Sequence, residues 1–159
     1  MTAKLLFLSK RARPDLQQAV AFLTTRVSSP DSDDYKKLGR VIRYLRAFPE
    51  LPLTLECDNL HMIRWWIDAS FAVHNDMKSH TGGTMSLGKG SVFSTSTRQK
   101  LNTKSSTEAE LVAVDDLMPM VIWTKHFLKE QVYDTTATIY QDNQSAMLLE
   151  KNGRKSSGR

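Results

Sequence analysis

The chain has 159 residues, of which 40% are hydrophobic, and carries a net charge of +5 at pH 7. This length and apolar content suit one packed domain, or one domain with a piece of another, and exclude a chain that is disordered throughout. The single cysteine, Cys57, excludes an internal disulfide and favours a reducing compartment, and no apolar run is long enough for a signal peptide core or a membrane span.

Residues 1–50 have the spacing of helices. Pro14 and Asp15 suit the start of one helix, which we expect to continue to about Val27. A second helix is expected from about Asp31, with an apolar face and a basic face. The apolar face holds Tyr35, Leu38, Ile42 and Leu45, and the basic face holds Lys36, Lys37, Arg40, Arg43 and Arg46. The basic face is either a solvated surface or one that binds phosphates.

From about residue 53 the pattern changes to strands separated by polar turns. The expected strands are 53–55, 62–73, 81–87 and 91–98, with turns at 75–80 and 88–90. Because the turns between the later strands are short, the sequence predicts an antiparallel meander.

After residue 104 the spacing of apolar residues becomes helical again. Two overlapping Ser/Thr-x-x-Glu patterns at 105–110 fit the capping box of a helix start. We expect this helix to reach about Lys129, with a kink or break near Pro119. A short strand at 138–141 and a helix from Gln144 follow. The order predicts an α/β protein with an α+β mixed sheet: three antiparallel strands, then helix, strand and helix, all preceded by an α-helical segment.

Three carboxylates lie on separate elements of this predicted domain. Asp68 is in the middle of the strand at 62–73, Glu110 is in the first turn of the long helix, and Asp142 ends the last strand. If the last strand lies beside the first, the three can meet and hold magnesium or manganese, and two such ions can cleave a phosphodiester. Each also has a simpler interpretation, because Asp68 could lie at a sheet edge and the other two could cap helices.

Charge is unevenly distributed along the chain. Residues 1–55 hold ten Lys/Arg against five Asp/Glu, residues 56–150 hold eight against twelve, and residues 151–159 hold four and none. A basic N-terminal part, an acidic centre and a basic tail suit a protein that binds a polyanion around a metal. Chance fluctuation explains the same pattern, so charge alone leaves both interpretations open.

Four motifs carry a resemblance to a known family. They are WIDAS at 66–70, KSHTGG at 78–83, SSTEAEL at 105–111 and QDNQSA at 141–146. Together they resemble the ribonuclease H domain of copia-type retrotransposon polyproteins. Residues 5–50, with LSKRARPD at 8–15, resemble the end of the preceding reverse transcriptase and its connection.

The resemblance implies a ribonuclease H-like fold and two regions. Residues 1–55 would be the helical end of the reverse transcriptase or its connection region, and 60–153 a C-terminally truncated ribonuclease H-like domain. The composition of 154–159 predicts a basic disordered tail after them. The resemblance also implies an intracellular location, in the cytoplasm or in virus-like particles, with the nucleus left open. The implied partners are an RNA–DNA hybrid and the rest of the reverse transcriptase polyprotein, with no membrane.

The resemblance also assigns roles to residues. Asp68, Glu110 and Asp142 would be the catalytic, metal-binding carboxylates of an endonuclease that hydrolyses the RNA strand of RNA–DNA hybrids with Mg²⁺, or alternatively Mn²⁺. Glu110 fits the family pattern better than Glu108, and the two lie about 200° apart on a helix, so only one can face the sheet. The family carries a fourth carboxylate on a later helix, which no residue before Arg159 matches. Activity is therefore open, and a non-catalytic nucleic-acid-binding remnant is the alternative.

Several further residues are candidates for contacts with the substrate. Ribonucleases H contact the backbone and 2′-hydroxyls across a shallow groove, which polar and basic side chains can reach. The candidates near the carboxylates are Ser70, Lys78, Arg98, Lys104, Asn143 and Gln144. Each basic one is also consistent with an ordinary solvated charge.

Aromatic and histidine residues are expected to have other roles. We expect Trp65, Trp66 and Trp123 to lie in the core rather than to stack on bases. His74 and His80 are expected at the surface or on the substrate side. Cys57 and the histidines lack the spacing of a zinc site.

Overall fold

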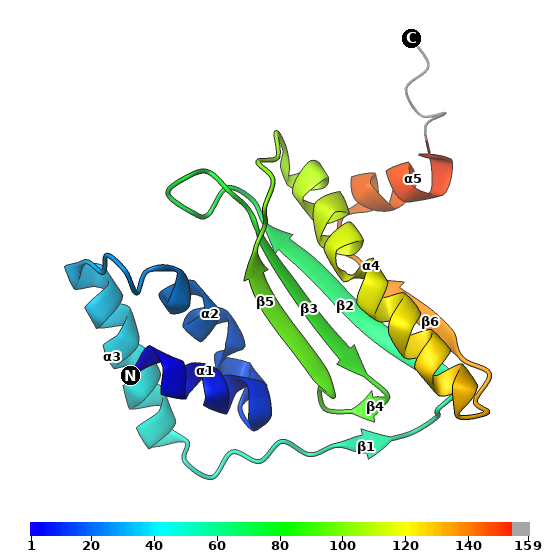
Figure 1. Cartoon of the computed structure of the whole chain (residues 1–159), viewed down its shortest axis with the longest axis horizontal. Helices are drawn as coiled ribbons and strands as arrows, with labels where there is room; N and C mark the ends of the chain where they lie inside the picture. Colours follow the sequence, from blue (N-terminus) through cyan, green and yellow to red (C-terminus); the bar gives the residue numbers. More distant parts are fainter. Residues whose placement is uncertain (154–159) are drawn as a thin grey trace. The chain divides into compact units, whose positions relative to one another are not determined.

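The computed structural model describes residues 1–153, shown in Figure 1, and the tail predicted at 154–159 lies outside them. The chain divides into two compact units, Met1–Leu55 and a second unit that begins at Glu56. We describe each unit by itself. Within the described residues, none of the helices has both the length and the apolar character needed to cross a bilayer.

The first unit is a small helical bundle. It consists of α1 (Thr2–Arg11), a 3₁₀ turn (Pro14–Leu16), α2 (Gln17–Thr25) and α3 (Ser32–Ala47). Pro14 begins a helical segment as expected, but a separate helix, α1, precedes it. The bundle closes around a cluster of buried aliphatic residues: Leu5, Leu16, Val20, Leu23 and Val41.

The start of α3 is fixed by a reciprocal cap. The Asp31 carboxylate accepts from the backbone N–H groups of Asp33 and Asp34, and the Asp34 carboxylate accepts from the N–H of Asp31. Arg26, just after α2, forms ion pairs with both Asp31 and Asp34. These bonds satisfy orphan N–H groups at the helix start, which a cap of this kind stabilises by about 1 kcal/mol.

The second unit is a four-stranded mixed sheet with a long helix on it. The strand order is β5-β3-β2-β6, from β2 (Met62–Ser70), β3 (His80–Ser86), β5 (Phe93–Arg98) and β6 (Thr136–Tyr140). The first three strands pair antiparallel as predicted, and β6 lies parallel to β2. The helix α4 (Ser106–Glu130) crosses over from β5 to β6, and α5 (Gln144–Asn152) follows (Figure 1).

Alternation along β2 separates its two faces. Ile63, Trp65 and Ile67 are buried and pack with residues of α4 such as Leu117 and Val121. Gly83 of β3 lies under this helix, since a Cβ there would overlap the Leu117 side chain. The helix therefore packs directly on the centre of the sheet.

Two predicted core residues lie on the surface instead. Trp65 is fully buried, but Trp66 is 43% exposed and Trp123 is 59% exposed. Trp66 alternates with Trp65 and stacks on Tyr140 of the neighbouring strand, with ring centroids 5.2 Å apart. Trp123 stacks on Phe127 on the outer side of α4. Both expectations were wrong because a strand and a helix each turn only one face to the core.

The structure also differs from local expectations in three places. The short strand expected at 53–55 is replaced by β1 (Glu56–Cys57), which pairs with β4 (Gly88–Lys89) in a small separate sheet. The residues expected to form a simple hairpin turn at 88–90 thus include a strand. The helix α4 continues through Pro119, so the break expected there as one alternative was wrong, and the other alternative, a kink, stays a prediction. Pro119 and Asp115 are both exposed, so solvent can bond the carbonyl that the missing N–H leaves free.

Candidate metal centre

The parallel pairing of β2 with β6 brings two of the three carboxylates to one edge of the sheet. Trp66 pairs with Tyr140 in the register, and Asp68 and Asp142 each lie two residues further along. Because parallel strands have their carboxyl ends at the same edge, the two side chains leave neighbouring strands at the same level. The sequence predicted this neighbourhood only on the condition that these strands pair.

The third carboxylate comes from the first turns of α4. Glu110 is only 5% exposed, because this side of the helix is turned toward the sheet. Glu108 serves the helix start instead: its backbone N–H donates to the Ser105 hydroxyl, and its carboxylate accepts from the N–H of Lys104. The structure therefore brings Glu110, and not Glu108, to the other two carboxylates.

Asp68, Glu110 and Asp142 form one cluster. Each offers a carboxylate oxygen, and these oxygens lie within 4.8 Å of one another. Burial raises the pKa of Glu110 above its ordinary value, and the charges of Asp68 and Asp142 raise it further. A hydrogen bond from the Gln141 amide, at 3.0 Å, acts in the opposite direction. Three acids held this close disfavour their joint ionisation unless a cation neutralises them.

The donor set fits a hard divalent cation. All three ligand groups are carboxylates, which Mg²⁺ and Mn²⁺ prefer over nitrogen or sulfur. Opposite ligands of an octahedral Mg²⁺ are about 4.2 Å apart, because each Mg–O bond is about 2.1 Å, and the upper limit of 4.8 Å on the separation of the three oxygens is of the same order. Glu110 is buried while Asp68 and Asp142 are exposed, which leaves one side open to water and substrate.

The predicted substrate contacts fall into two groups by their place in the fold. Ser70 and Arg98 flank His80 in the sheet register, beyond Asp68 along β2. Lys78 and Arg98 both lie near Asp76, whose carboxylate is 3.8 Å and 3.5 Å from them. Asp76 thus partly compensates two of the cations predicted to bind phosphate.

The other group surrounds the starts of α4 and α5. Lys104 is exposed just before α4, and Gln144 is exposed as the first residue of α5. The Asn143 side-chain oxygen accepts from the N–H of Ala146 and caps α5, so that oxygen is engaged in the fold. Its amide N–H₂ is the group with which Asn143 could bind a substrate.

Two histidines differ from the prediction. His74 and His80 are buried, with His74 Nε2 2.9 Å from His80 Nδ1 and His80 Nε2 2.7 Å from the Ser96 hydroxyl. Burial, and then the charge of His74, lowers the pKa of His80 to about 4. Surface placement was therefore wrong for both, because the loop between β2 and β3 folds His74 over His80.

Gln141 is a site residue that sequence reasoning missed. Its amide bonds the Glu110 carboxylate, and its side-chain oxygen accepts from the N–H of Asn143. It thus links the ligand on the helix to the loop that carries Asp142. Its position directly before Asp142 was the one signal in the sequence.

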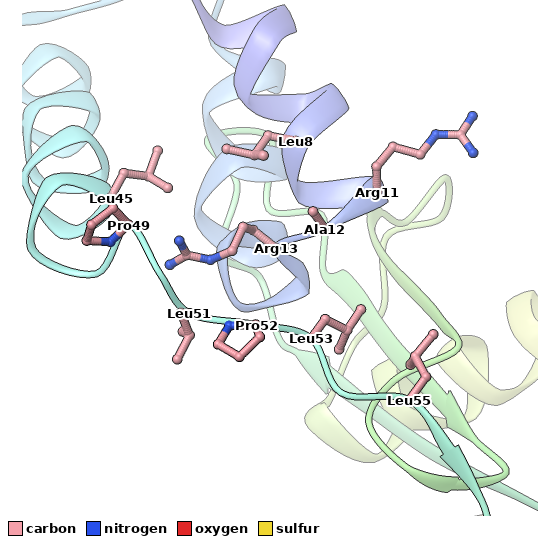
Figure 2. Close-up of a pocket in the computed structure, with 10 residues that line it drawn as sticks. All are labelled: Leu8, Arg11, Ala12, Arg13, Leu45, Pro49, Leu51, Pro52, Leu53 and Leu55. Carbon is pink, nitrogen blue, oxygen red and sulfur yellow. The ribbon is translucent and has the colours of Figure 1, made fainter.

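A groove in the first unit offers a different kind of surface. It has a volume of about 450 Å³ and lies between α1, the end of α3 and the segment that follows α3 (Figure 2). Arg13 bonds the Asp15 carboxylate and the Phe48 carbonyl, and Arg11 extends away from the leucines. The other lining residues are Leu8, Ala12, Leu45, Pro49, Leu51, Pro52, Leu53 and Leu55. Apart from the two arginines this lining is apolar, and it offers no set of catalytic groups.

Comparison with known proteins gives sequence relatives only. The chain is 30% identical over 146 residues to the "Retrovirus-related Pol polyprotein from transposon TNT 1-94" of Nicotiana tabacum, a match that covers 88% of this chain and 11% of the relative. It is 32% identical to the polyprotein from transposon RE2 of Arabidopsis thaliana, covering 86% of this chain and 10% of the relative. No family model matches the chain, and no solved structure matches it.

A further relative carries a different name. The chain is 28% identical to the "Secreted RxLR effector protein 161" of Plasmopara viticola, over 75% of this chain and 84% of that protein. The chain spans about a tenth of the length of the transposon polyproteins it matches. Its homologues thus include retrovirus-related Pol polyproteins of plant transposons, and the similarity covers most of the chain.

Proposed function

We propose that the second unit is a ribonuclease H-like endonuclease domain, which hydrolyses the RNA strand of RNA–DNA hybrids during retrotransposon reverse transcription. The observation that carries this proposal is the cluster of Asp68, Glu110 and Asp142, with oxygens within 4.8 Å of one another. The order of the strands, the four motifs and the similarity to transposon polyproteins support it.

The three carboxylates would hold Mg²⁺, or alternatively Mn²⁺. When bound, such ions activate water and stabilise the leaving oxygen of a phosphodiester. Asp68 lies on β2, an inner strand of the sheet, and Glu110 on a helix packed against that sheet, so two ligands come from rigid elements. Gln141 holds the Glu110 carboxylate by its amide, which orients one ligand before any cation arrives.

The substrate would lie on the exposed side of the cluster. Ser70 and Gln144 offer hydrogen-bonding groups for the sugar and its 2′-hydroxyl, as does the amide N–H₂ of Asn143. Lys78, Arg98 and Lys104 would bind phosphates. Contacts of these kinds recognise the shape and the sugar–phosphate backbone of a hybrid and not its bases. We therefore expect cleavage with little dependence on base sequence.

Cleavage of a labelled hybrid tests this proposal. The chain is incubated with a hybrid labelled on its RNA strand, in the presence of Mg²⁺, and the products are separated by size. We expect Asp68→Asn to lose activity by at least about 100-fold, because it removes a ligand charge at the centre of the cluster. Glu108→Gln is the matched control, since Glu108 lies two residues from a ligand but outside the cluster. Equal rates for the chain and Asp68→Asn would disprove the catalytic role.

The alternative is a nucleic-acid-binding remnant without catalysis. The observation that favours it is the excess of basic residues in the first unit, which contains ten Lys/Arg and five Asp/Glu. This alternative predicts salt-sensitive binding of duplexes, unchanged in Asp68→Asn, and no cleavage by the unmodified chain. Absence of binding at low salt would exclude it.

A further inference from the structure

We propose that the outer face of α3 is a docking surface for the sugar–phosphate backbone of a nucleic-acid duplex. Four exposed basic residues form this surface, which we call the α3 ridge: Lys36, Arg40, Arg43 and Arg46. The inference concerns the first unit alone and does not depend on the metal cluster. It gives a specific location to what the sequence showed only as a basic helix face.

Helix geometry aligns the ridge. Lys36, Arg40 and Arg43 are spaced four and three residues apart, which places them on one face of α3, and Arg46 flanks them one turn later. At a rise of about 1.5 Å per residue, the ridge extends about 15 Å along the helix axis. A duplex carries about one phosphate charge per 1.7 Å of its length, so several phosphates come within reach of the four side chains.

Within the described residues the three arginines of the ridge have no counter-charge of their own, and Lys36 has only the influence of Asp33, which pairs with Lys37. Asp15 pairs with Arg13, Asp31 and Asp34 pair with Arg26, and Asp33 pairs with Lys37. Of the five acids in the first unit, these pairs leave only Glu50 without a cation. Within residues 1–153 no ion pair involves any residue of the ridge. Its charge is therefore available to an external anion.

The ridge stands on a fixed helix. The opposite side of α3 is packed: Val41 is buried in the bundle, and Leu38 and Leu45 lie against the same cluster. The reciprocal Asp31–Asp34 cap and Arg26 hold the N-terminal end. Because the helix is ordered before binding, an anion has to order only the four side chains, which keeps the entropic cost of docking low.

The chemistry of the ridge favours phosphates over an acidic protein. Three of its four residues are arginines, whose planar guanidinium groups bond phosphate oxygens in pairs. The other residues on this face include Gly39 and Ala47, so no large apolar side chain stands between the cations. Protein interfaces rely on aromatic and apolar anchors at their centre, whereas the exposed aromatic residues of α3, Tyr35 and Tyr44, lie beside the line of cations and not within it. A backbone of phosphates can therefore lie flat on it.

The experiment measures binding of fluorescently labelled 20-base-pair duplexes to the full chain by anisotropy. EDTA is present, so cleavage cannot contribute to the signal. We compare the chain with the triple variant Lys36→Gln, Arg40→Gln, Arg43→Gln. The matched control is Lys125→Gln, Lys129→Gln, Lys151→Gln, which removes the same charge from exposed positions of the second unit. Circular dichroism checks that each variant is folded.

We expect the ridge variant to bind the duplex at least about 10-fold more weakly at 0.1 M salt. The plot of the logarithm of its association constant against the logarithm of salt concentration should be less steep by about 3, because three phosphate contacts are lost. The control variant should stay within about 3-fold of the unmodified chain. The charge-preserving variant Lys36→Arg, Arg40→Lys, Arg43→Lys should retain binding if charge carries the contact. Binding should also persist in Asp68→Asn, which separates this inference from the nuclease proposal.

Three outcomes would overturn the inference. One is equal weakening by the ridge and control variants, which would indicate a diffuse effect of net charge. Another is full competition by poly-glutamate at equal charge concentration, which would indicate an acidic protein partner. The last is a preference for single strands over duplexes, which would indicate that the duplex backbone is not what the ridge binds.

Discussion

His74 and His80 form a buried pair that couples the fold to pH. Their ring nitrogens are 2.9 Å apart, and His80 also bonds the Ser96 hydroxyl. The pKa of His74 is lowered by burial and by Arg98, while Asp76 opposes this shift. Both pKa shifts favour the neutral form of the pair, which joins the loop between β2 and β3 to the start of β3.

This pair predicts a loss of stability in mild acid. The pKa of His80 is about 4 in the fold against an ordinary value of 6.5. Between these two pH values, His80 is therefore mostly protonated in the unfolded chain and mostly neutral in the folded chain. The free energy of unfolding should therefore fall as pH drops from about 6.5 toward 4, and should not depend on this group above 6.5. Urea unfolding at several pH values from 7.5 to 4.5 measures it.

The variant His80→Gln provides the control for this pH dependence. Glutamine does not titrate, so its stability should fall less steeply than that of the unmodified chain between pH 6.5 and 5. Carboxylates contribute equally to both proteins in this range. Parallel curves for the two proteins would show that His80 does not carry the effect.

At the scale of single elements, the packing of α4 on β3 depends on one glycine. A Cβ at Gly83 would overlap the Leu117 side chain, whereas a Cβ at Gly82 would have the Asp68 carbonyl 3.7 Å away, an ordinary contact. The two glycines are adjacent in the same strand and differ in which face they occupy. Neither has a positive φ, so alanine is allowed by the backbone at both.

We expect Gly83→Ala to lower the free energy of unfolding by about 1–3 kcal/mol, because overpacking displaces the helix or the Leu117 rotamer. Gly82→Ala should change it by less than about 1 kcal/mol, since only the backbone preference of glycine is altered. Urea unfolding followed by tryptophan fluorescence gives both values. A Gly82→Ala effect as large as that of Gly83→Ala would show that helix packing is not the cause.

The elements themselves were largely readable from the sequence. The aromatic and β-branched composition of 62–73 predicted the strand that the structure has at Met62–Ser70, short turns predicted the antiparallel strands, and the return of helical spacing predicted α4. The three-carboxylate cluster followed once β6 was assumed to lie beside β2, because register then fixes Asp68 against Asp142. These features depend on local composition and periodicity, which a single sequence carries.

Features that depend on contacts far apart in the chain could not be predicted. The pairing of Glu56–Cys57 with Gly88–Lys89 is such a contact, and no local pattern distinguishes it from a loop and a turn. The burial of His80 depends on a loop that folds back on it, and the Gln141–Glu110 bond joins a loop to a distant helix. Trp66 and Trp123 were misplaced because aromatic composition does not tell which face of an element is covered.

At the scale of the whole molecule, the two units differ in the spectroscopic signals by which their unfolding can be followed. Trp65, Trp66 and Trp123 are the three tryptophans of the chain, and all lie in the second unit. Tryptophan fluorescence therefore follows the unit that contains the carboxylate cluster. Circular dichroism follows the helices of both units, so the two signals together separate their unfolding.

Cation binding should stabilise the folded second unit. If Mg²⁺ binds the carboxylate cluster and not the unfolded chain, a concentration ten times the dissociation constant adds about 1.4 kcal/mol. It also relieves the mutual repulsion of the three acids, which burial of Glu110 makes worse. We therefore expect the melting temperature detected by tryptophan fluorescence to rise by several degrees as Mg²⁺ is added, and to return when EDTA removes it.

The variant Asp142→Asn distinguishes stabilisation by Mg²⁺ bound at the carboxylate cluster from a general effect of ionic strength on stability. The variant keeps the shape of the side chain but removes one ligand charge, so its melting temperature should rise much less with Mg²⁺ and should change equally with Na⁺ at matched ionic strength. It should also melt higher than the unmodified chain when cations are absent, because one source of repulsion is gone. Equal Mg²⁺ shifts in the two proteins would place the ion elsewhere and leave the cluster as an acidic patch without a metal.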